Sequence, residues 1–295
     1  MRPVLRTARR GITATVVATA VACFGGVALA ADINGTNGND TRHGTSGDDS
    51  ISGGHGDDTL FGEGGNDTID GGPDSDTADG GPGNDRVAGA SCEVGEVGRL
   101  CDNPGNERLV GGTGNDTLLA NTCVVTFCKY DRYIAFASTY DGGPGNDRVV
   151  GADGRDLMRG GPGADNLEGV NGADRIFGGP DNDEIVGGGS PDLLSGDDGN
   201  DRIKGRAGAD RILGGRGNDR LWGVDGDDTM IGGPGNDRLK GGFGVDDMSG
   251  GEGNDRFYTR EDGVADRIDC GPGAHDVALV DASDVVKNCE NVDRG

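Results

Sequence analysis

An aspartate recurs every nine residues over most of this chain. Each one follows a glycine-rich segment and in most copies stands two residues before an aliphatic or aromatic side chain. The spacing is kept by Asp40, Asp49, Asp58, Asp67, Asp76 and Asp85, by Asp116, and by Asp147, Asp156, Asp165, Asp174, Asp183, Asp192, Asp201, Asp210, Asp219, Asp228, Asp237, Asp246 and Asp255. So short a unit, repeated so regularly, predicts a β-solenoid of stacked coils rather than a globular fold.

The segment Gly232–Lys240, GGPGNDRLK, shows every position of the repeat. We expect its first six residues to form a turn and its last three a short strand. Glycines at the first, second and fourth places permit positive φ and let backbone carbonyls turn inward. Leu239 is the one apolar residue of the unit, so it must face the interior. Its equivalents are Ile51, Leu60, Ile69, Val87, Leu118, Val149, Met158, Leu167, Ile176, Ile185, Leu194, Ile203, Ile212, Leu221, Met230, Met248 and Phe257.

The turn chemistry favours a hard divalent cation. The carboxylate of Asp237 beside inward carbonyls makes an all-oxygen site, which suits calcium better than magnesium, because magnesium keeps its waters. Zinc prefers Cys and His, which the repeats almost lack. The other interpretation is a solvated acidic face, or aspartates that serve only as turn residues. The strict spacing favours the cation, since like charges stacked at a strand spacing of about 4.8 Å repel one another.

The consensus G-G-x-G-x-D-x-U-x resembles the RTX, or haemolysin-type, calcium-binding nonapeptide repeat. Near-complete copies include Gly80–Val87, Gly142–Val149, Gly214–Leu221 and Gly250–Phe257. The resemblance implies an all-β fold, a right-handed parallel β-roll in which two nonapeptides form one coil. It further implies calcium ions held between turns on the same side, so that each ion bridges residues two repeats apart.

We therefore predict multiple Ca²⁺ ions, but fewer ions than repeats. The fourth-place glycine is replaced by Asp74, Asp181 and Ser190, and Arg42 stands where the repeat of Asp40 needs an apolar residue. The predicted metal ligands are Asp49, Asp58, Asp67, Asp76, Asp85, Asp116, Asp147, Asp156, Asp165, Asp174, Asp183, Asp192, Asp201, Asp210, Asp219, Asp228, Asp237, Asp246 and Asp255.

Spacing and composition divide the chain into five parts. Residues 1–30 have a basic start, an apolar stretch and an A-x-A site at Ala28–Ala30, which predicts a signal peptide for the general or the twin-arginine route. Residues 31–90 form a first repeat array and 142–260 a second. Residues 91–141 hold irregular insertions and one or two repeats, including a decayed copy at Glu107 and Leu109. Residues 261–295 should cap the last coil.

Six cysteines remain once Cys23 leaves with the signal peptide, an even number that predicts three disulfides in an exported protein. Pairing of nearest neighbours gives Cys92–Cys101, Cys123–Cys128 and Cys270–Cys289, although fifteen connectivities are possible. The first two would staple the insertions and the third the C-terminal cap. A reduced, metal-bound set is the rival interpretation, and the wide scatter of these cysteines disfavours it.

The sequence argues against an enzyme. Only three histidines occur, and neither H-E-x-x-H nor G-x-S-x-G is present. A net charge of −25 disfavours nucleic acid and favours cations. We predict a secreted, extracellular, non-catalytic protein that folds on binding calcium, has no membrane span in its mature chain and has no partner that the sequence identifies. The alternative is a calcium-dependent adhesin or surface-binding module acting through the 119–140 insertion, where Tyr130, Tyr133 and Tyr140 gather.

Overall fold

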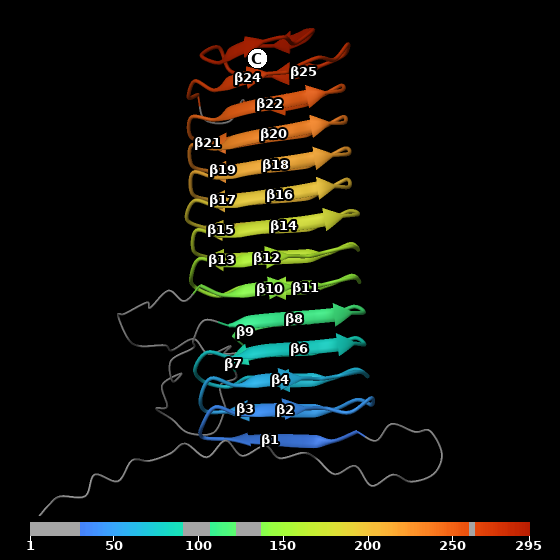
Figure 1. Cartoon of the computed structure of the whole chain (residues 1–295). Coiled ribbons are helices and arrows are strands. Elements are labelled where there is room, and N and C mark those ends of the chain that lie inside the picture. Colours follow the sequence, from blue (N-terminus) through green and yellow to red (C-terminus); the bar gives the residue numbers. More distant parts are fainter. Residues whose placement is uncertain (1–29, 91–106, 122–136, 260–262) are drawn as a thin grey trace, which may run out of the picture.

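The computed structural model describes residues 30–90, 107–121, 137–259 and 263–295. These residues form two parallel sheets of 14 and 13 strands. Odd-numbered strands build one sheet and even-numbered strands the other, so the chain changes sheet after every strand. The coils stack into one straight column that runs from β1 at one end to the C-terminus at the other (Figure 1). The predicted parallel β-roll is confirmed.

The strands are short, and most begin at the residue that follows an aspartate of the repeat. The odd-numbered strands are β1 (Asp32–Thr36), β3 (Ser50–Gly54), β5 (Thr68–Asp70), β7 (Arg86–Ala90), β9 (Thr117–Asn121), β11 (Arg148–Val150), β13 (Asn166–Asn171), β15 (Glu184–Gly189), β17 (Arg202–Ala207), β19 (Arg220–Asp225), β21 (Arg238–Phe243), β23 (Arg256–Tyr258), β25 (Val277–Leu279) and β27 (Asn291–Asp293). The even-numbered strands are β2 (Thr41–His43), β4 (Thr59–Phe61), β6 (Thr77–Pro82), β8 (Arg108–Thr113), β10 (Thr139–Asp141), β12 (Leu157–Arg159), β14 (Arg175–Pro180), β16 (Leu193–Asp198), β18 (Arg211–Arg216), β20 (Thr229–Pro234), β22 (Asp247–Glu252), β24 (Arg267–Asp269) and β26 (Val285–Lys287).

The pairing register puts equivalent repeat positions directly above one another. Leu221 pairs with Leu239 between β19 and β21, and Leu239 pairs with Phe257 between β21 and β23. The same positions stay aligned across the longer connections, where Val87 pairs with Leu118 and Leu118 with Val149. Every repeat position therefore forms a column along the roll, as the resemblance implies.

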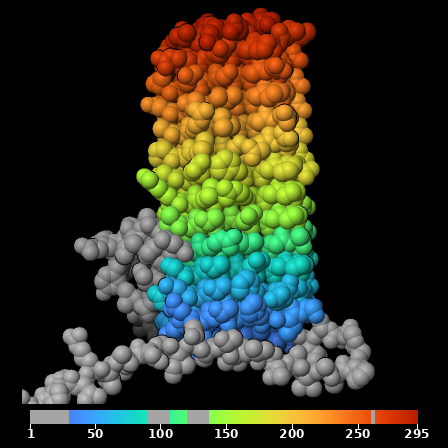
Figure 2. Space-filling view, in the orientation of Figure 1, coloured from blue at the N-terminus to red at the C-terminus, as the bar shows by residue number. Residues whose placement is uncertain are grey.

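The core is one cluster of apolar side chains in which each sheet contributes one column. Every predicted inward residue is at most 2% exposed, because each stands on the inner side of its strand. Ala78, Leu109 and Tyr140 occupy the same position at 0% exposure. The space-filling view shows the coils packed directly on one another along the roll (Figure 2).

Tyr140 corrects part of the sequence interpretation. We expected it in the 119–140 insertion, but it is a core residue of β10 and pairs with Leu109 and Met158. Ser138, two residues earlier, takes the place of the repeat aspartate and is buried. Residues 137–141 are thus a degenerate repeat, while Tyr130 and Tyr133 lie outside the described residues.

The C-terminal segment continues both sheets through β24, β25, β26 and β27. Ile268, Ala278 and Val280 extend the core, whereas Val285 is 62% exposed. The predicted disulfide Cys270–Cys289 is present, with a Cα–Cα distance of 5.1 Å. It ties β24 to the end of the chain.

Three of the predictions fall outside the described residues. They are the pairs Cys92–Cys101 and Cys123–Cys128, and the signal peptide, of which only residue 30 is described. Across the part of the chain that the structure describes, no helix is both long and apolar enough to cross a membrane.

Candidate metal sites in the turns

The repeat aspartates are buried at the turns, and each uses one carboxylate oxygen to join neighbouring coils. Oδ1 of Asp237 accepts the backbone N–H of Asp219 at 2.8 Å, and Oδ1 of Asp255 accepts that of Asp237 at 2.8 Å. On the other side of the roll, Oδ1 of Asp246 accepts the N–H of Asp228 at 2.9 Å. The aspartates therefore form two continuous columns, one on each side of the roll.

The second carboxylate oxygen, Oδ2, is buried and accepts no hydrogen bond at most of these positions. Among the predicted ligands that the structure describes, this holds for Asp58, Asp67, Asp76, Asp85, Asp116, Asp147, Asp165, Asp174, Asp183, Asp192, Asp201, Asp210, Asp219, Asp228, Asp237 and Asp255. A buried carboxylate oxygen with neither donor nor counter-ion is strongly unfavourable. These atoms need either a proton or a cation.

A glycine keeps space open beside each of these oxygens. A Cβ on Gly232 would lie 2.3 Å from Oδ2 of Asp237 and 2.6 Å from the carbonyl oxygen of Gly250 in the next coil. Only glycine leaves room for a carboxylate oxygen and a carbonyl oxygen to converge there. The turn thus holds an open cradle lined by both kinds of oxygen.

This first-place glycine corrects our expectation about backbone conformation. Gly233 and Gly235, at the second and fourth places, have φ values of 112° and 156°, as expected. Gly232 has no positive φ, so conformational freedom is not what its position requires. It is needed because any side chain would occupy the cradle.

The donor set fits calcium. Carboxylate and carbonyl oxygens are the ligands of a hard cation with flexible coordination. Within the described ranges, no group of three or more His, Cys, Asp or Glu side chains converges in a way that could hold a metal ion. The cradles pair single carboxylates with backbone carbonyls, which suits calcium better than zinc, whose usual ligands are Cys and His.

The substituted fourth-place residues preserve the turn. Asp74, Asp181 and Ser190 adopt φ values of 89°, 87° and 81°, in the region that glycine occupies in the complete copies. The aspartates that follow them, Asp76, Asp183 and Asp192, have the same partnerless Oδ2 as the others. The departures from consensus at these copies leave the cradle in place.

Burial shifts the ionisation of these carboxyls. Loss of hydration is the largest cause and raises the pKa of Asp237 to about 7 and that of Asp174 and Asp183 to about 8. The backbone hydrogen bond from the preceding aspartate lowers the pKa in part, while neighbouring carboxylates raise it further. Without a cation, the aspartates of these columns stay protonated up to a higher pH than an ordinary aspartate does.

Two predicted ligands are built differently. Oδ2 of Asp49 accepts the backbone N–H of Thr45, and Oδ2 of Asp156 accepts that of Ala152 at 2.9 Å. Asp40, which we did not predict as a ligand, is bonded in the same way by Thr36. The array therefore contains two kinds of turn, which the sequence pattern does not distinguish.

Sequence reasoning also missed acidic residues at the C-terminal end. Asp266, Asp276 and Asp284 accept the N–H groups of Asp246, Asp255 and Asp266 at 2.9, 2.7 and 3.0 Å, so the ladder of aspartates continues into the cap. Their signal was an aspartate two residues before Ile268, Ala278 and Val286, at irregular spacing.

The decayed copy at Glu107 is confirmed. Its Oε2 accepts the N–H of Asp76 at 2.9 Å, as an aspartate of the repeat would. Glu107 also passes the ladder onward, because its own N–H donates to the hydroxyl of Ser138 at 3.2 Å.

The sequence profile of the RTX calcium-binding nonapeptide repeat matches residues 34–69, 61–91, 103–122, 141–170, 159–194, 186–221 and 222–257, which together make up more than half of the chain. The chain belongs to this RTX repeat family. Its turns are those of a calcium-binding repeat protein. No curated protein matches this RTX chain.

One solved structure with a similar fold is the X-ray crystal structure of a hyperactive, Ca²⁺-dependent, β-helical antifreeze protein from an Antarctic bacterium. The similarity covers 88% of this chain and 83% of that chain, with 18% identity and a TM-score of 0.48.

Proposed function

We propose that this RTX protein is exported, is not an enzyme, and folds outside the cell as calcium ions fill the open turns. The observation that carries the proposal is the double column of buried Oδ2 atoms without a hydrogen-bond partner. The proposed ligands are the aspartates of these open turns together with backbone carbonyls such as that of Gly250.

Calcium supplies the positive charge that these turns lack. An ionised carboxylate buried without a partner is unfavourable, and stacked carboxylates also repel one another. A cation bound only in the folded state converts its binding free energy into folding free energy. The protein therefore folds only where calcium is abundant.

The setting follows from the affinity that such sites have. Extracellular calcium modules bind with dissociation constants of about 10⁻⁴ to 10⁻³ M. At cytosolic calcium concentrations the chain stays unfolded and suited to translocation, and it folds after export. The disulfide Cys270–Cys289 supports this setting, because disulfides persist in oxidising compartments.

The adhesin alternative loses one of its supports. Tyr140, one of the tyrosines that suggested a contact surface between residues 119 and 140, is buried in the core at 0% exposure. No observation on the described residues favours that function over calcium-driven folding.

The experiment is a titration of calcium into the purified, calcium-free protein, followed by far-ultraviolet circular dichroism with magnesium as control. We expect a cooperative transition from coil to β-structure at about millimolar calcium, and a much weaker response to magnesium. A full β-spectrum in excess chelator would contradict the proposal. An equal response to both ions would contradict the preference for calcium.

A further inference from the structure

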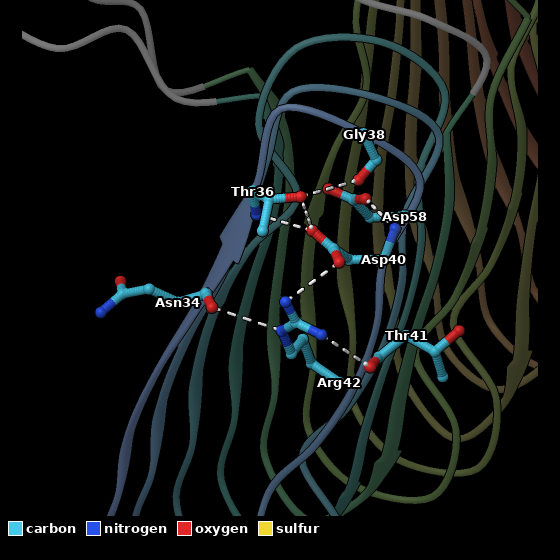
Figure 3. A network of polar contacts seen from close by, with 7 residues as sticks. All are labelled: Asn34, Thr36, Gly38, Asp40, Thr41, Arg42 and Asp58. Atoms are coloured by element: carbon cyan, nitrogen blue, oxygen red, sulfur yellow. Dashed lines mark hydrogen bonds and ion pairs between the residues drawn. The ribbon is translucent and has the colours of Figure 1, made fainter. Parts of the chain in front are cut away.

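In three turns, a backbone amide of the same turn donates to the second carboxylate oxygen of the aspartate. Oδ2 of Asp40 accepts the backbone N–H of Thr36 at 2.6 Å and the Thr36 hydroxyl at 2.8 Å, as Figure 3 shows. Asp49 and Asp156 receive the corresponding bond from Thr45 and Ala152, again the residue four positions before the aspartate. In these closed turns the chain itself supplies the donor that the open turns lack.

Backbone conformation separates the two kinds of turn. In the other seventeen array turns the residue four positions before the aspartate has positive φ: Gly54, Glu63, Gly72, Gly81, Gly112, Gly143, Gly161, Val170, Gly179, Gly188, Asp197, Arg206, Gly215, Val224, Gly233, Gly242 and Gly251. Thr36, Thr45 and Ala152 do not. No described array turn departs from this correspondence.

The conformation decides where the amide points. With positive φ, the N–H of Gly72 donates to the carbonyl oxygen of Gly89 in the next coil at 2.8 Å, and that of Gly161 donates to Gly178 at 3.0 Å. The amide is then committed to the coil above and cannot reach the carboxylate. Without positive φ, the amide turns back onto Oδ2 of its own turn.

The carboxylate of Asp40 also lies farther from its first-place glycine. In the open turns, a Cβ on the first-place glycine would lie between 2.0 Å (Gly223) and 2.5 Å (Gly142) from Oδ2. The distance is 3.1 Å at Gly35, whereas those at Gly44 and Gly151, 2.7 and 2.6 Å, are close to the open-turn range. Only the oxygen of Asp40 is clearly displaced from the cradle, toward the amide that holds it.

Residue type alone does not explain the difference. Val170 and Val224 are β-branched, yet they hold φ values of 82° and 94°, which such residues rarely adopt. What the three closed turns share is the backbone conformation of this residue, not its type.

We infer that the three closed turns hold no calcium, so that the ions of both columns lie only at the open turns. The inference rests on the proposed calcium binding and removes Asp49 and Asp156 from the predicted ligands. Both oxygens of Asp156 are already used, Oδ1 by the N–H of Ser138 at 2.8 Å and Oδ2 by that of Ala152. A cation there would have to displace an amide whose positive end points at the same oxygen.

The test counts bound ions by native mass spectrometry at saturating calcium in two matched pairs of variants. Asp156→Asn and Asp174→Asn are neighbours in one column, and Asp49→Asn and Asp67→Asn are neighbours in the other. We expect D174N and D67N each to lose at least one ion relative to the unchanged protein. D156N and D49N should keep the full count.

Loss of an ion in D156N and D49N, equal to the loss in their partners, would overturn the inference while calcium binding itself stands. An unchanged protein that binds no ions would overturn both proposals. Should the variants at Asp156 and Asp49 not fold, an anomalous difference map of the unchanged, calcium-loaded protein decides the question. No peak is expected beside Oδ2 of Asp156 or Asp49, and a calcium peak there would overturn the inference.

Discussion

The ends of the roll and its middle are stabilised in different ways. In the first coil, the buried guanidinium of Arg42 pairs with Asp40 at 3.0 Å and also donates to the backbone carbonyl of Asn34 (Figure 3). At the other end, the disulfide Cys270–Cys289 and the 2.8 Å ion pair between Lys287 and Asp269 hold the cap. Between them, from β13 to β22, most aspartates keep a buried oxygen that no group of the protein satisfies.

Ionisation follows the same division. Burial alone would raise the pKa of Asp40, but hydrogen bonds from Thr36 and the charge of Arg42 outweigh it and hold this pKa below its ordinary value. Burial raises the pKa of Asp237 to about 7. The first coil carries its own counter-charge and the cap its own cross-link, whereas in the middle the proposed calcium ions would supply the missing positive charge.

The largest expected effect is that of calcium removal. We predict that stepwise chelation, followed by hydrogen exchange, removes amide protection from β13 to β22 at higher free calcium than from the disulfide-bonded cap. The physical reason is that the middle loses the charges that neutralise its carboxylates. Protection of the middle that survives excess chelator would break the comparison.

A matched pair of glycines gives the next effect. Gly235 stands two residues before Asp237 with φ at 156°, and a Cβ there would lie 1.6 Å from the carbonyl oxygen of Gly217. Gly38 stands two residues before Asp40, has no positive φ and has nothing within 4 Å of such a Cβ. In urea unfolding at fixed calcium, Gly235→Ala should cost about 2–4 kcal/mol.

Gly38→Ala is the control for that measurement, and it should stay within about 0.5 kcal/mol of the unchanged protein. Equal costs for the two substitutions would mean that neither the positive φ of Gly235 nor its contact with Gly217 of the neighbouring coil sets the cost of a side chain there.

Removal of the disulfide tests whether the cap can be destabilised independently of the rest of the roll. Replacing Cys270 and Cys289 together by alanine removes a link across 19 residues, which should destabilise the cap by about 3 kcal/mol. Because coils of a solenoid interact mainly with their neighbours, we expect hydrogen exchange at saturating calcium to accelerate in β24 to β27 and not in β14 to β18. Acceleration along the whole roll would contradict independent ends.

The smallest effect is that of pH on the calcium-free protein. The folded-state pKa values of Asp237, Asp174 and Asp183 stand at about 7, 8 and 8, above the ordinary value of 3.8. Protonation therefore favours the fold, and this stability is present below about pH 4 and lost as the pH rises through about 7 to 8. Circular dichroism in chelator should show more β-structure at pH 5 than at pH 8.

Asp40 changes the stability in the opposite direction. Because its folded-state pKa is lowered, its ionised form stabilises the fold at pH values above the ordinary pKa of an aspartate, and that stability is lost in acid. The many open-turn carboxyls outnumber it. A calcium-free protein whose β-structure increases with pH would show that desolvation of these carboxyls does not control the middle.

Much of the fold was predictable because one spacing encodes both the turn and the core. An aspartate followed two residues later by Leu239 or its equivalents is enough to place each strand and its inner face. The prediction failed where a substitution hid the pattern. Ser138 replaces the aspartate before Tyr140, and Ala78, which is small, was not predicted as a core residue.

The candidate sites were predictable only at the level of residue type. Every repeat aspartate enters the ladder of hydrogen bonds, but the sequence does not distinguish an open turn from a closed one. Ala152 closes its turn while Val170, one coil later, leaves its own open. That difference arises from backbone conformation within a stack of coils, which no single nonapeptide encodes.

The most direct test is a crystal structure of the calcium-loaded protein with an anomalous difference map. Calcium-driven folding of open turns predicts an anomalous peak beside Oδ2 of aspartates such as Asp174, Asp219 and Asp237, and none beside Asp40, Asp49 and Asp156. A well-ordered roll whose open turns contain only water, at millimolar calcium, would contradict the account.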